Sequence, residues 1–262
     1  MLPENQVIQM LWIGDRLSTM ERLSIRSFQA NGHTVHLYVY GDVQNIPEGT
    51  VVKDGNEIIS GTRITDFWCP AMFADLFRHA LLINGGWYAD TDFVCLRPLD
   101  FPQPYVFYRD QQLTTATTAL CKTPKDAPVM KFWFDTVNKM TKDQLQSAEY
   151  QAVGPTMTRK TLMPNSAYAY GRRNNDYRRF EHLQQYFKPG MTFDPVNYQK
   201  AGLLVDPNTR WDLSQSHALH LFSGAWGNMP QHDARPDYAA LGSKDMAYPS
   251  GCLYEVLKEK YL

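Results

Sequence analysis

The stretch Gly85-Gly86-Trp87-Tyr88-Ala89-Asp90-Thr91-Asp92-Phe93 predicts the fold of this chain most directly. Two glycines permit a tight reversal of the backbone, and the residues after them suit an extended segment. Side chains alternate between the two faces of such a segment, so Tyr88, Asp90 and Asp92 share one face. The intervening side chains lie on the other face, which can pack against a core.

Asp90 and Asp92 bring two carboxylates to that shared face. Their repulsion is relieved by a divalent cation that prefers oxygen ligands, such as Mg²⁺ or Mn²⁺. The stretch is therefore predicted to form a metal site. The alternative is a strand end whose aspartates are only solvated, because an isolated Asp-x-Asp triplet is common.

A helix over about 70 to 83 is predicted to lead into the glycines. Pro70 is a good first helical residue. Apolar residues then recur at helical spacing and form one stripe. The residues of this stripe are Phe73, Leu76, Phe77, Ala80 and Leu81.

Asp75 and Arg78 lie off this stripe, three positions apart, and so share a face of the helix. The glycine reversal connects the helix directly to the acidic segment. Asp75 and Arg78 can therefore face one pocket together with Asp90 and Asp92. The alternative is an ion pair on the helix surface.

The first forty residues predict a strand, a helix and a second strand. Residues 7–12 form an apolar run that ends at a loop, and the Ser18-x-x-Glu21 spacing is typical of a capping box at the start of a helix over about 19–31. Residues 34–40 then alternate as in a strand. This order is the opening unit of a parallel α/β sheet.

The remaining chain continues the alternation of strands and helices. A short edge strand is possible at Val51-Val52, and an amphipathic helix opens at Pro128. A basic loop could bind phosphate or an acidic acceptor, or be merely solvated. Its residues are Arg172, Arg173, Arg178 and Arg179. Strands are also predicted at 105–108 and 117–121, and a helix near 156–163.

The overall composition fits a globular protein. The chain has 262 residues, 44% of them hydrophobic, with a formal net charge of −1. That balance gives no general attraction to nucleic acid or an anionic membrane, so neither is an expected partner. The first residues lack a secretory signal pattern and no apolar run reaches about 18 residues, which predicts a cytoplasmic protein. Without a repeat or linker, we expect a single domain over 1–262.

Four segments together resemble the retaining, metal-dependent glycosyltransferases with an Asp-x-Asp motif. These include the family-32 capsular and mannosyl transferases and, more distantly, the glucosyltransferase domains of large clostridial toxins. An Asp-x-x-Arg helix followed by Gly-Gly-x-Tyr-x-Asp-x-Asp is much rarer than an isolated Asp-x-Asp. The four segments are Leu11-Trp12-Ile13-Gly14, Ala74-Asp75-Leu76-Phe77-Arg78, the stretch from Gly85 to Asp92, and Ser223 to Trp226.

The resemblance implies a GT-A fold, which is a Rossmann-like, mainly parallel sheet flanked by helices. It also implies a nucleotide-sugar donor, with UDP as the expected nucleotide, and Mn²⁺ or Mg²⁺ as cofactor. Residues up to about 100 would hold the donor and the metal. Residues from about 101 to 262 would hold the acceptor and close the site.

The same resemblance assigns residues to the donor. Trp12 would stack on the nucleobase and Ile13 would be part of the same donor site, although a Trp at a strand end is also a common core residue. Asp75 and Arg78 would hold the sugar and the ribose or phosphate, and Tyr88 would support the nucleotide. The Gly154-Pro155 turn resembles one on the acceptor side of these enzymes.

The remaining assignments concern the metal and the diphosphate. Asp90 and Asp92 would serve the ribose and the metal, while Ser223 and Trp226 would cap the diphosphate. Because the late segment has no acidic ligand, His220 is the predicted third metal ligand. The predicted catalytic residues are Asp75, Arg78, Asp90 and Asp92.

The predicted reaction is sugar transfer with retention, by attack on the same face that the diphosphate leaves. A donor phosphate oxygen would accept the proton of the acceptor. A surface or capsular glycan is the expected acceptor, and a protein or a DNA base is the alternative. Two other classes remain open, a phosphatase that is phosphorylated on Asp90 and a non-catalytic carbohydrate-binding module.

Overall fold

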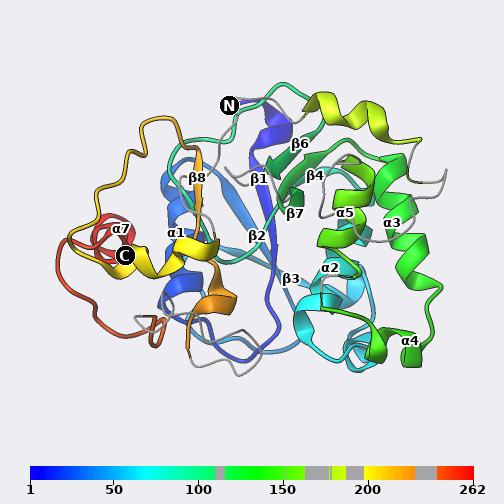
Figure 1. Cartoon of the computed structure of the whole chain (residues 1–262), viewed down its shortest axis with the longest axis horizontal. Helices are drawn as coiled ribbons and strands as arrows, with labels where there is room; N and C mark the ends of the chain where they lie inside the picture. The colour runs from blue at the N-terminus through cyan, green and yellow to red at the C-terminus, as the bar shows by residue number, and fades with distance from the viewer. Residues whose placement is uncertain (110–115, 151, 163–176, 178, 187–197, 228–240) are drawn as a thin grey trace.

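The computed structural model describes residues 1–109, 116–150, 152–162, 177, 179–186, 198–227 and 241–262. A central six-stranded sheet separates α1 on one face from α2 and α3 on the other (Figure 1). The described helices are α1 Thr19–Ala30, α2 Pro70–Ile83, α3 Pro128–Asn138, α4 Lys142–Ser147, α5 Pro155–Leu162 and α7 Leu253–Tyr261. The strands are β1 Val7–Leu11, β2 Thr34–Val39, β3 Val51–Asp54, β4 Gly86–Ala89, β5 Phe93–Cys95, β6 Val106–Arg109, β7 Ala116–Thr123 and β8 Ala218–His220.

The six strands lie in the order β3-β2-β1-β4-β7-β6. The pairs β3–β2, β2–β1 and β1–β4 are parallel, and β7 runs antiparallel to both β4 and β6. The sheet is therefore mixed and mainly parallel, as the sequence predicts. Because β1 and β4 are adjacent and parallel, with Gln9 paired to Tyr88, their carboxyl ends lie at the same edge of the sheet.

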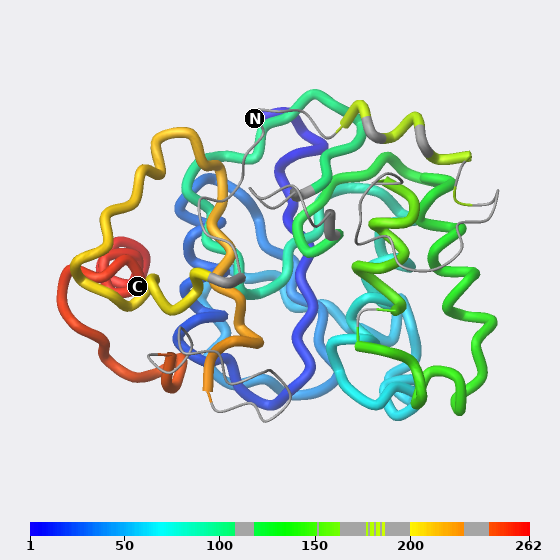
Figure 2. Tube along the Cα trace, viewed as in Figure 1, coloured from blue at the N-terminus to red at the C-terminus, as the bar shows by residue number. Residues whose placement is uncertain are grey.

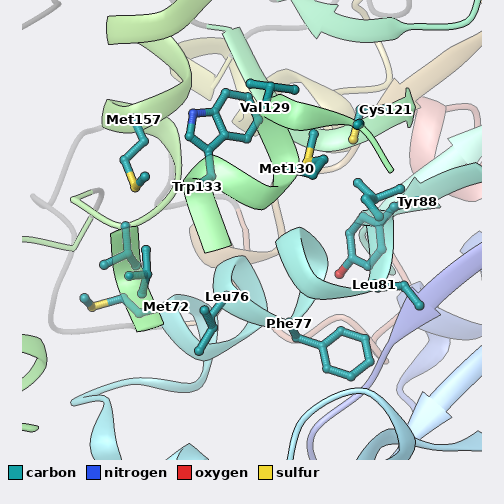
Figure 3. Close-up of a cluster of buried hydrophobic side chains, with 14 of the residues drawn as sticks. Met72, Leu76, Phe77, Leu81, Tyr88, Cys121, Val129, Met130, Trp133 and Met157 are labelled. Carbon is teal, nitrogen blue, oxygen red and sulfur yellow. The ribbon is translucent and has the colours of Figure 1, made fainter. Parts of the chain in front are cut away.

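The alternation predicted for the central stretch holds within β4. Trp87 and Ala89 are buried in the core between the sheet and α1. Tyr88 is buried in the other core, where side chains of α2 and α3 surround it (Figure 3). Both faces of β4 are therefore covered, which is typical of a central strand in an α/β sheet.

The prediction of one continuous extended segment through Asp92 is wrong. β4 ends at Ala89, residues 91 and 92 form a turn, and Phe93 begins β5. β5 leaves the large sheet and pairs with β8 in a separate two-stranded sheet. Asp90 and Asp92 therefore flank a turn, which closes with a hydrogen bond from Phe93 N to Asp90 O of 3.3 Å.

The predicted helices and strands of the described chain are confirmed within two or three residues at each end. The capping box is also present, since Glu21 Oε2 accepts from Ser18 N at 2.8 Å. The two helices α1 and α7 lie side by side although they come from opposite ends of the chain (Figure 2). Among the described residues, no helix combines the length and the apolar character that a membrane span requires.

Three residues of the predicted basic loop, Arg172, Arg173 and Arg178, lie outside the described residues. Arg179 is exposed, and its guanidinium lies 4.7 Å from the ring centre of Phe132 and 4.8 Å from that of Phe180. Arg179 therefore stacks on Phe132 of α3 and on the neighbouring Phe180.

Candidate active site

Arg78 joins the two acidic segments that the sequence predicts to meet. Its Nη1 donates to Asp75 Oδ1 at 3.0 Å and to Thr118 Oγ1 at 2.9 Å, and its Nη2 donates to Asp90 Oδ1 at 2.7 Å. Its guanidinium carbon also lies 4.8 Å from the ring centre of Tyr88. The buried guanidinium fork of Arg78 thus links α2, β4 and β7. The alternative prediction, an ion pair on the helix surface, is wrong.

Burial at this junction shifts the pKa values of the carboxylates. Burial raises the pKa of Asp75 to about 6, although Arg78 opposes the shift and Asp90 adds to it. The pKa of Asp90 is also raised, mainly by desolvation, with Arg78 opposing and Asp92 contributing. The charge of Asp92 thus contributes to the raised pKa of Asp90, although the two residues flank a turn.

Asp92 is held by the late segment of the chain. Its Oδ2 accepts from Ser223 N at 2.8 Å and lies 3.2 Å from His220 Nε2. Burial alone would raise the pKa of Asp92, but His220, the two hydrogen bonds and Lys244 outweigh burial and lower it. Within the described part of the chain, Asp92 Oδ1 is buried and has no hydrogen-bond partner. Asp92 is thus an ionised carboxylate with one oxygen unused.

His220 is fixed by two aromatic rings and one backbone pairing. Its ring stacks on Phe93 at 4.2 Å between centres and lies 4.0 Å from the ring of Phe222. His220 also pairs with Phe93 across β5 and β8. The chain reaches Ser223 through Phe222, which has a left-handed backbone with φ of 55°. This tight path brings Ser223 N to Asp92.

Gly154 lies directly against Asp75. A Cβ added at Gly154 would lie 2.2 Å from Asp75 Cγ and 2.2 to 2.4 Å from its two carboxylate oxygens. Only hydrogen fits in that space. The predicted Gly154-Pro155 turn therefore contacts Asp75, and Pro155 begins α5.

We expect Gly154→Ala to destabilise the protein, because the new methyl group must displace the buried Asp75 carboxylate. The expected loss is about 1 to 3 kcal/mol in the free energy of unfolding, measured by urea denaturation. Gly41→Ala is the matched control, since a Cβ there meets nothing within 4 Å. Equal stability of the two variants would contradict this close contact.

The pKa of Asp75 predicts a pH dependence of stability. Because the pKa in the folded protein, about 6, lies above the ordinary 3.8, folding favours the protonated form. The stability that this carboxyl contributes is complete below about pH 4 and is lost as the pH rises through 6, by roughly 3 kcal/mol. Asp75→Asn should flatten the stability profile between pH 4 and 7, whereas Asp135→Asn, at an exposed site on α3, should not. If the stability of the wild type, Asp75→Asn and Asp135→Asn depends on pH in the same way, the raised pKa of Asp75 is contradicted.

Trp12 and Ile13 follow β1 at the same sheet edge as the acidic residues. Trp12 is partly buried against the core beside α1, and Ile13 is partly buried against the core beside α2. Trp12 N donates to Tyr38 O at 2.9 Å, which fixes its backbone beside β2. Their assignment to a nucleobase stays a prediction.

Ser223 and Trp226 have different surroundings. Ser223 contacts Asp92 through its backbone, as described above. Trp226 is only 3% exposed, and its indole Nε1 donates to Leu221 O at 2.7 Å, so this N–H is not available to a diphosphate. The ring of Trp226 nevertheless lines a surface hollow. The other residues that line this hollow are Ser18, Gly227, Gly242, Ser243, Lys244 and Asp245.

Lys244 adds a positive charge that sequence reasoning missed. Its Nζ lies 2.9 Å from Glu21 Oε1, and its charge contributes to the lowered pKa of Asp92. Thr118, which supports Arg78, was also missed. Neither residue has a recognisable motif around it, so no signal in the sequence identifies them.

The described residues contain no group of three or more His, Cys, Asp or Glu side chains arranged to hold a metal ion. Asp92 and His220 are in contact, and Asp90 lies close to Asp92. The three-residue set Asp90, Asp92 and His220 therefore stays a prediction. What the protein offers to a cation directly is the unused Oδ1 of Asp92 and the neighbouring Asp90 carboxylate.

The fold and the site together define a mixed α/β protein with an acidic and basic cluster at the carboxyl edge of its parallel strands. No protein family model matches the chain, and no curated protein matches its sequence. One similar solved structure is that of the PaToxG glycosyltransferase, with a TM-score of 0.39 and 16% sequence identity. The alignment covers 57% of this chain and 64% of that one, and a likeness this low carries no argument about function.

Proposed function

We propose that the protein is a metal-dependent glycosyltransferase that moves a sugar from a nucleoside diphosphate to an acceptor hydroxyl. The observation that carries the proposal is the ionised Asp92, held on one oxygen and unpaired on the other, beside the Arg78 fork. In open α/β sheets, ligands bind at the carboxyl ends of the strands, which is where this cluster lies. The four motif segments are the second support.

The proposed donor site combines predicted and newly found residues. Trp12 and Ile13 border the nucleobase, and Tyr88 supports the nucleotide from beneath Arg78. Asp75 and Arg78 hold the transferred sugar. Lys244, which lines the hollow beside Trp226 and contributes to the lowered pKa of Asp92, would contact the diphosphate.

The donor atoms of the site fit Mn²⁺ or Mg²⁺. Both cations prefer carboxylate oxygens, and the buried Oδ1 of Asp92 has no other described partner. Asp90 would be the second ligand, with His220 as a third ligand or as the group that orients Asp92. A bound divalent cation would supply Lewis-acid stabilisation of the charge that develops on the leaving diphosphate.

We propose transfer with retention by front-face substitution. Arg78 engages both Asp75 and Asp90, and the unpaired oxygen of Asp92 is assigned to the cation, so none of these carboxylates is left to act as a nucleophile. A phosphate oxygen of the donor would then accept the proton of the attacking hydroxyl. Isolation of a covalent glycosyl-enzyme on any carboxylate would refute this route.

The proposed acceptor is a glycan, such as a surface or capsular polysaccharide. A protein or a DNA base remains the alternative acceptor. A phosphatase is less consistent with the site, because the Arg78 fork holds the Asp90 carboxylate that would have to attack phosphate.

A donor screen tests the proposal. The protein is incubated with UDP- and GDP-sugars in the presence of Mn²⁺, Mg²⁺ or EDTA, and release of the nucleoside diphosphate is measured. We expect hydrolysis of at least one donor, dependent on the metal. If no nucleotide sugar is consumed and neither UDP nor GDP binds in calorimetry with Mn²⁺, the assignment is wrong, and a carbohydrate-binding module becomes the better reading.

A further inference from the structure

Two large aromatic side chains remain exposed beside the site. Trp68 is 37% exposed and Tyr150 is 40% exposed, and their ring centres lie 5.9 Å apart at an angle of 54°. The neighbouring Phe67 is only 5% exposed, so the chain buries one aromatic residue of this loop and leaves the next in contact with solvent. An exposed aromatic pair of this kind is typical of an interaction site.

The two rings belong to segments that are fastened together. Trp68 Nε1 donates to Ala148 O at 2.9 Å, and Gln146 Nε2 donates to Thr65 O at 3.2 Å. These bonds join the turn before α2 to α4 and the residues that follow it, which lie beside each other in Figure 1. The Trp68 ring is therefore held in place before any ligand arrives, which lowers the entropy lost on binding.

The pair lies at the rim of the acidic cluster. Trp68 is two residues before Pro70, the first residue of α2, and Asp75 lies in the second turn of that helix. Burial raises the pKa of the Tyr150 hydroxyl, and the next contributions come from Asp75 and Cys69, followed by Asp90 and Asp92. Tyr150 is also four residues before Gly154, which lies directly against the Asp75 carboxylate, so the pair lies near this end of the cluster.

We propose that Trp68 and Tyr150 form a stacking subsite for a pyranose ring of the acceptor saccharide. The identification of this ring as the acceptor rests on the glycosyltransferase function proposed above. The C–H face of a sugar ring is apolar and packs on an aromatic ring, while its hydroxyl groups remain free to donate hydrogen bonds.

A sugar ring suits this location better than a nucleotide. Arg78, the cation nearest to the pair along α2, is already engaged by Asp75 and Asp90, so it is less available to a phosphate group. The rings are tilted by 54° and form no parallel slot for a flat base. The proposed position for the base is at Trp12, which follows β1. The proposed position for the diphosphate is the hollow at Lys244 in the late segment.

Direct sugar binding tests the subsite without any need for turnover. The probes are the methyl α-pyranosides of glucose, galactose and mannose, measured by saturation-transfer NMR with the full chain. We expect at least one to bind, and the Trp68→Ala and Tyr150→Ala variants to bind it about tenfold more weakly. Trp68→Phe retains a ring and should retain most of the affinity. Tyr261→Ala removes a ring from α7, on the α1 side of the sheet, and should leave the affinity unchanged.

Calorimetry with UDP and GDP in the presence of Mn²⁺ separates this inference from the proposed function. Nucleotide binding that is equal in the wild type and both alanine variants supports an acceptor subsite. Nucleotide binding lost in those variants would overturn it in favour of a base platform. Absence of binding by all three pyranosides, or equal binding by wild type and variants of unchanged melting temperature, would also overturn it, whatever the donor screen shows.

Discussion

Asp92→Asn should reduce metal-dependent hydrolysis of the nucleotide sugar by about a hundredfold or more, the scale seen when one key polar group of an active site is removed. The amide oxygen can still accept from Ser223 N, so the loop beyond β8 remains in place. What the variant loses is the negative charge and the unpaired Oδ1. The loss should therefore appear in turnover and in Mn²⁺ affinity, together with a lower melting temperature, because the lowered pKa of Asp92 means that its charge also stabilises the fold.

The measurement combines three readouts on the same samples. Donor hydrolysis gives the activity, calorimetry gives the Mn²⁺ affinity, and circular dichroism gives the melting temperature. Asp135→Asn on α3 is the control, because it makes the same chemical change at an exposed position. Full activity of Asp92→Asn with the wild-type metal requirement would remove Asp92 from the proposed catalytic group.

Arg78→Ala should lower the free energy of unfolding by about 3 to 5 kcal/mol at neutral pH, the cost of leaving buried charges without a partner. The Arg78 side chain is only 5% exposed, and that of Asp75 is 11% exposed. Removal of the guanidinium leaves Asp75 and Asp90 beside each other without a counter-charge. The loss should be smaller at pH 4 than at pH 7, because protonated carboxyls do not repel.

Arg63→Ala is a matched control within the same protein. Arg63 and Asp66 also form an ion pair three residues apart, with an Nε to Oδ2 distance of 2.7 Å, but their side chains are 28% and 27% exposed. Loss of the Arg63–Asp66 ion pair should lower the free energy of unfolding by no more than about 1 kcal/mol. Arg78→Lys should fall between the two, since one ammonium group cannot reproduce the fork that reaches both carboxylates. Equal costs for Arg63→Ala and Arg78→Ala in urea unfolding would show that the buried fork is not a structural link.

Much of the geometry around Asp75, Arg78 and β4 could be predicted because it depends on short segments. Pro70 and the apolar stripe define α2, and the spacing of Asp75 and Arg78 places them on one face. The glycine reversal then leads directly into β4, and alternation correctly separates Trp87 from Tyr88. Each of these inferences uses interactions within a few residues, where backbone geometry leaves few choices.

The turn between Asp90 and Asp92 shows where this reasoning ends. The alternation of the sequence continues through Phe93, and nothing in the local pattern indicates that β4 stops at Ala89. The strand stops because β5 pairs with β8, which lies more than a hundred residues later. A partner so distant in sequence has no local signal.

The sequence by itself determined the order of strands and helices from β1 to β4, the parallel opening unit and the joint location of Asp75, Arg78 and Asp90. The tertiary structure alone decided that Asp92 is held by His220 and Ser223, that Gly154 touches Asp75, and that Lys244 approaches the site. It also placed Trp68 beside Tyr150. The physical reason is that periodicity and capping act over single turns and strands, whereas these contacts join segments about eighty to more than 130 residues apart and exist only after the sheets and helices have packed.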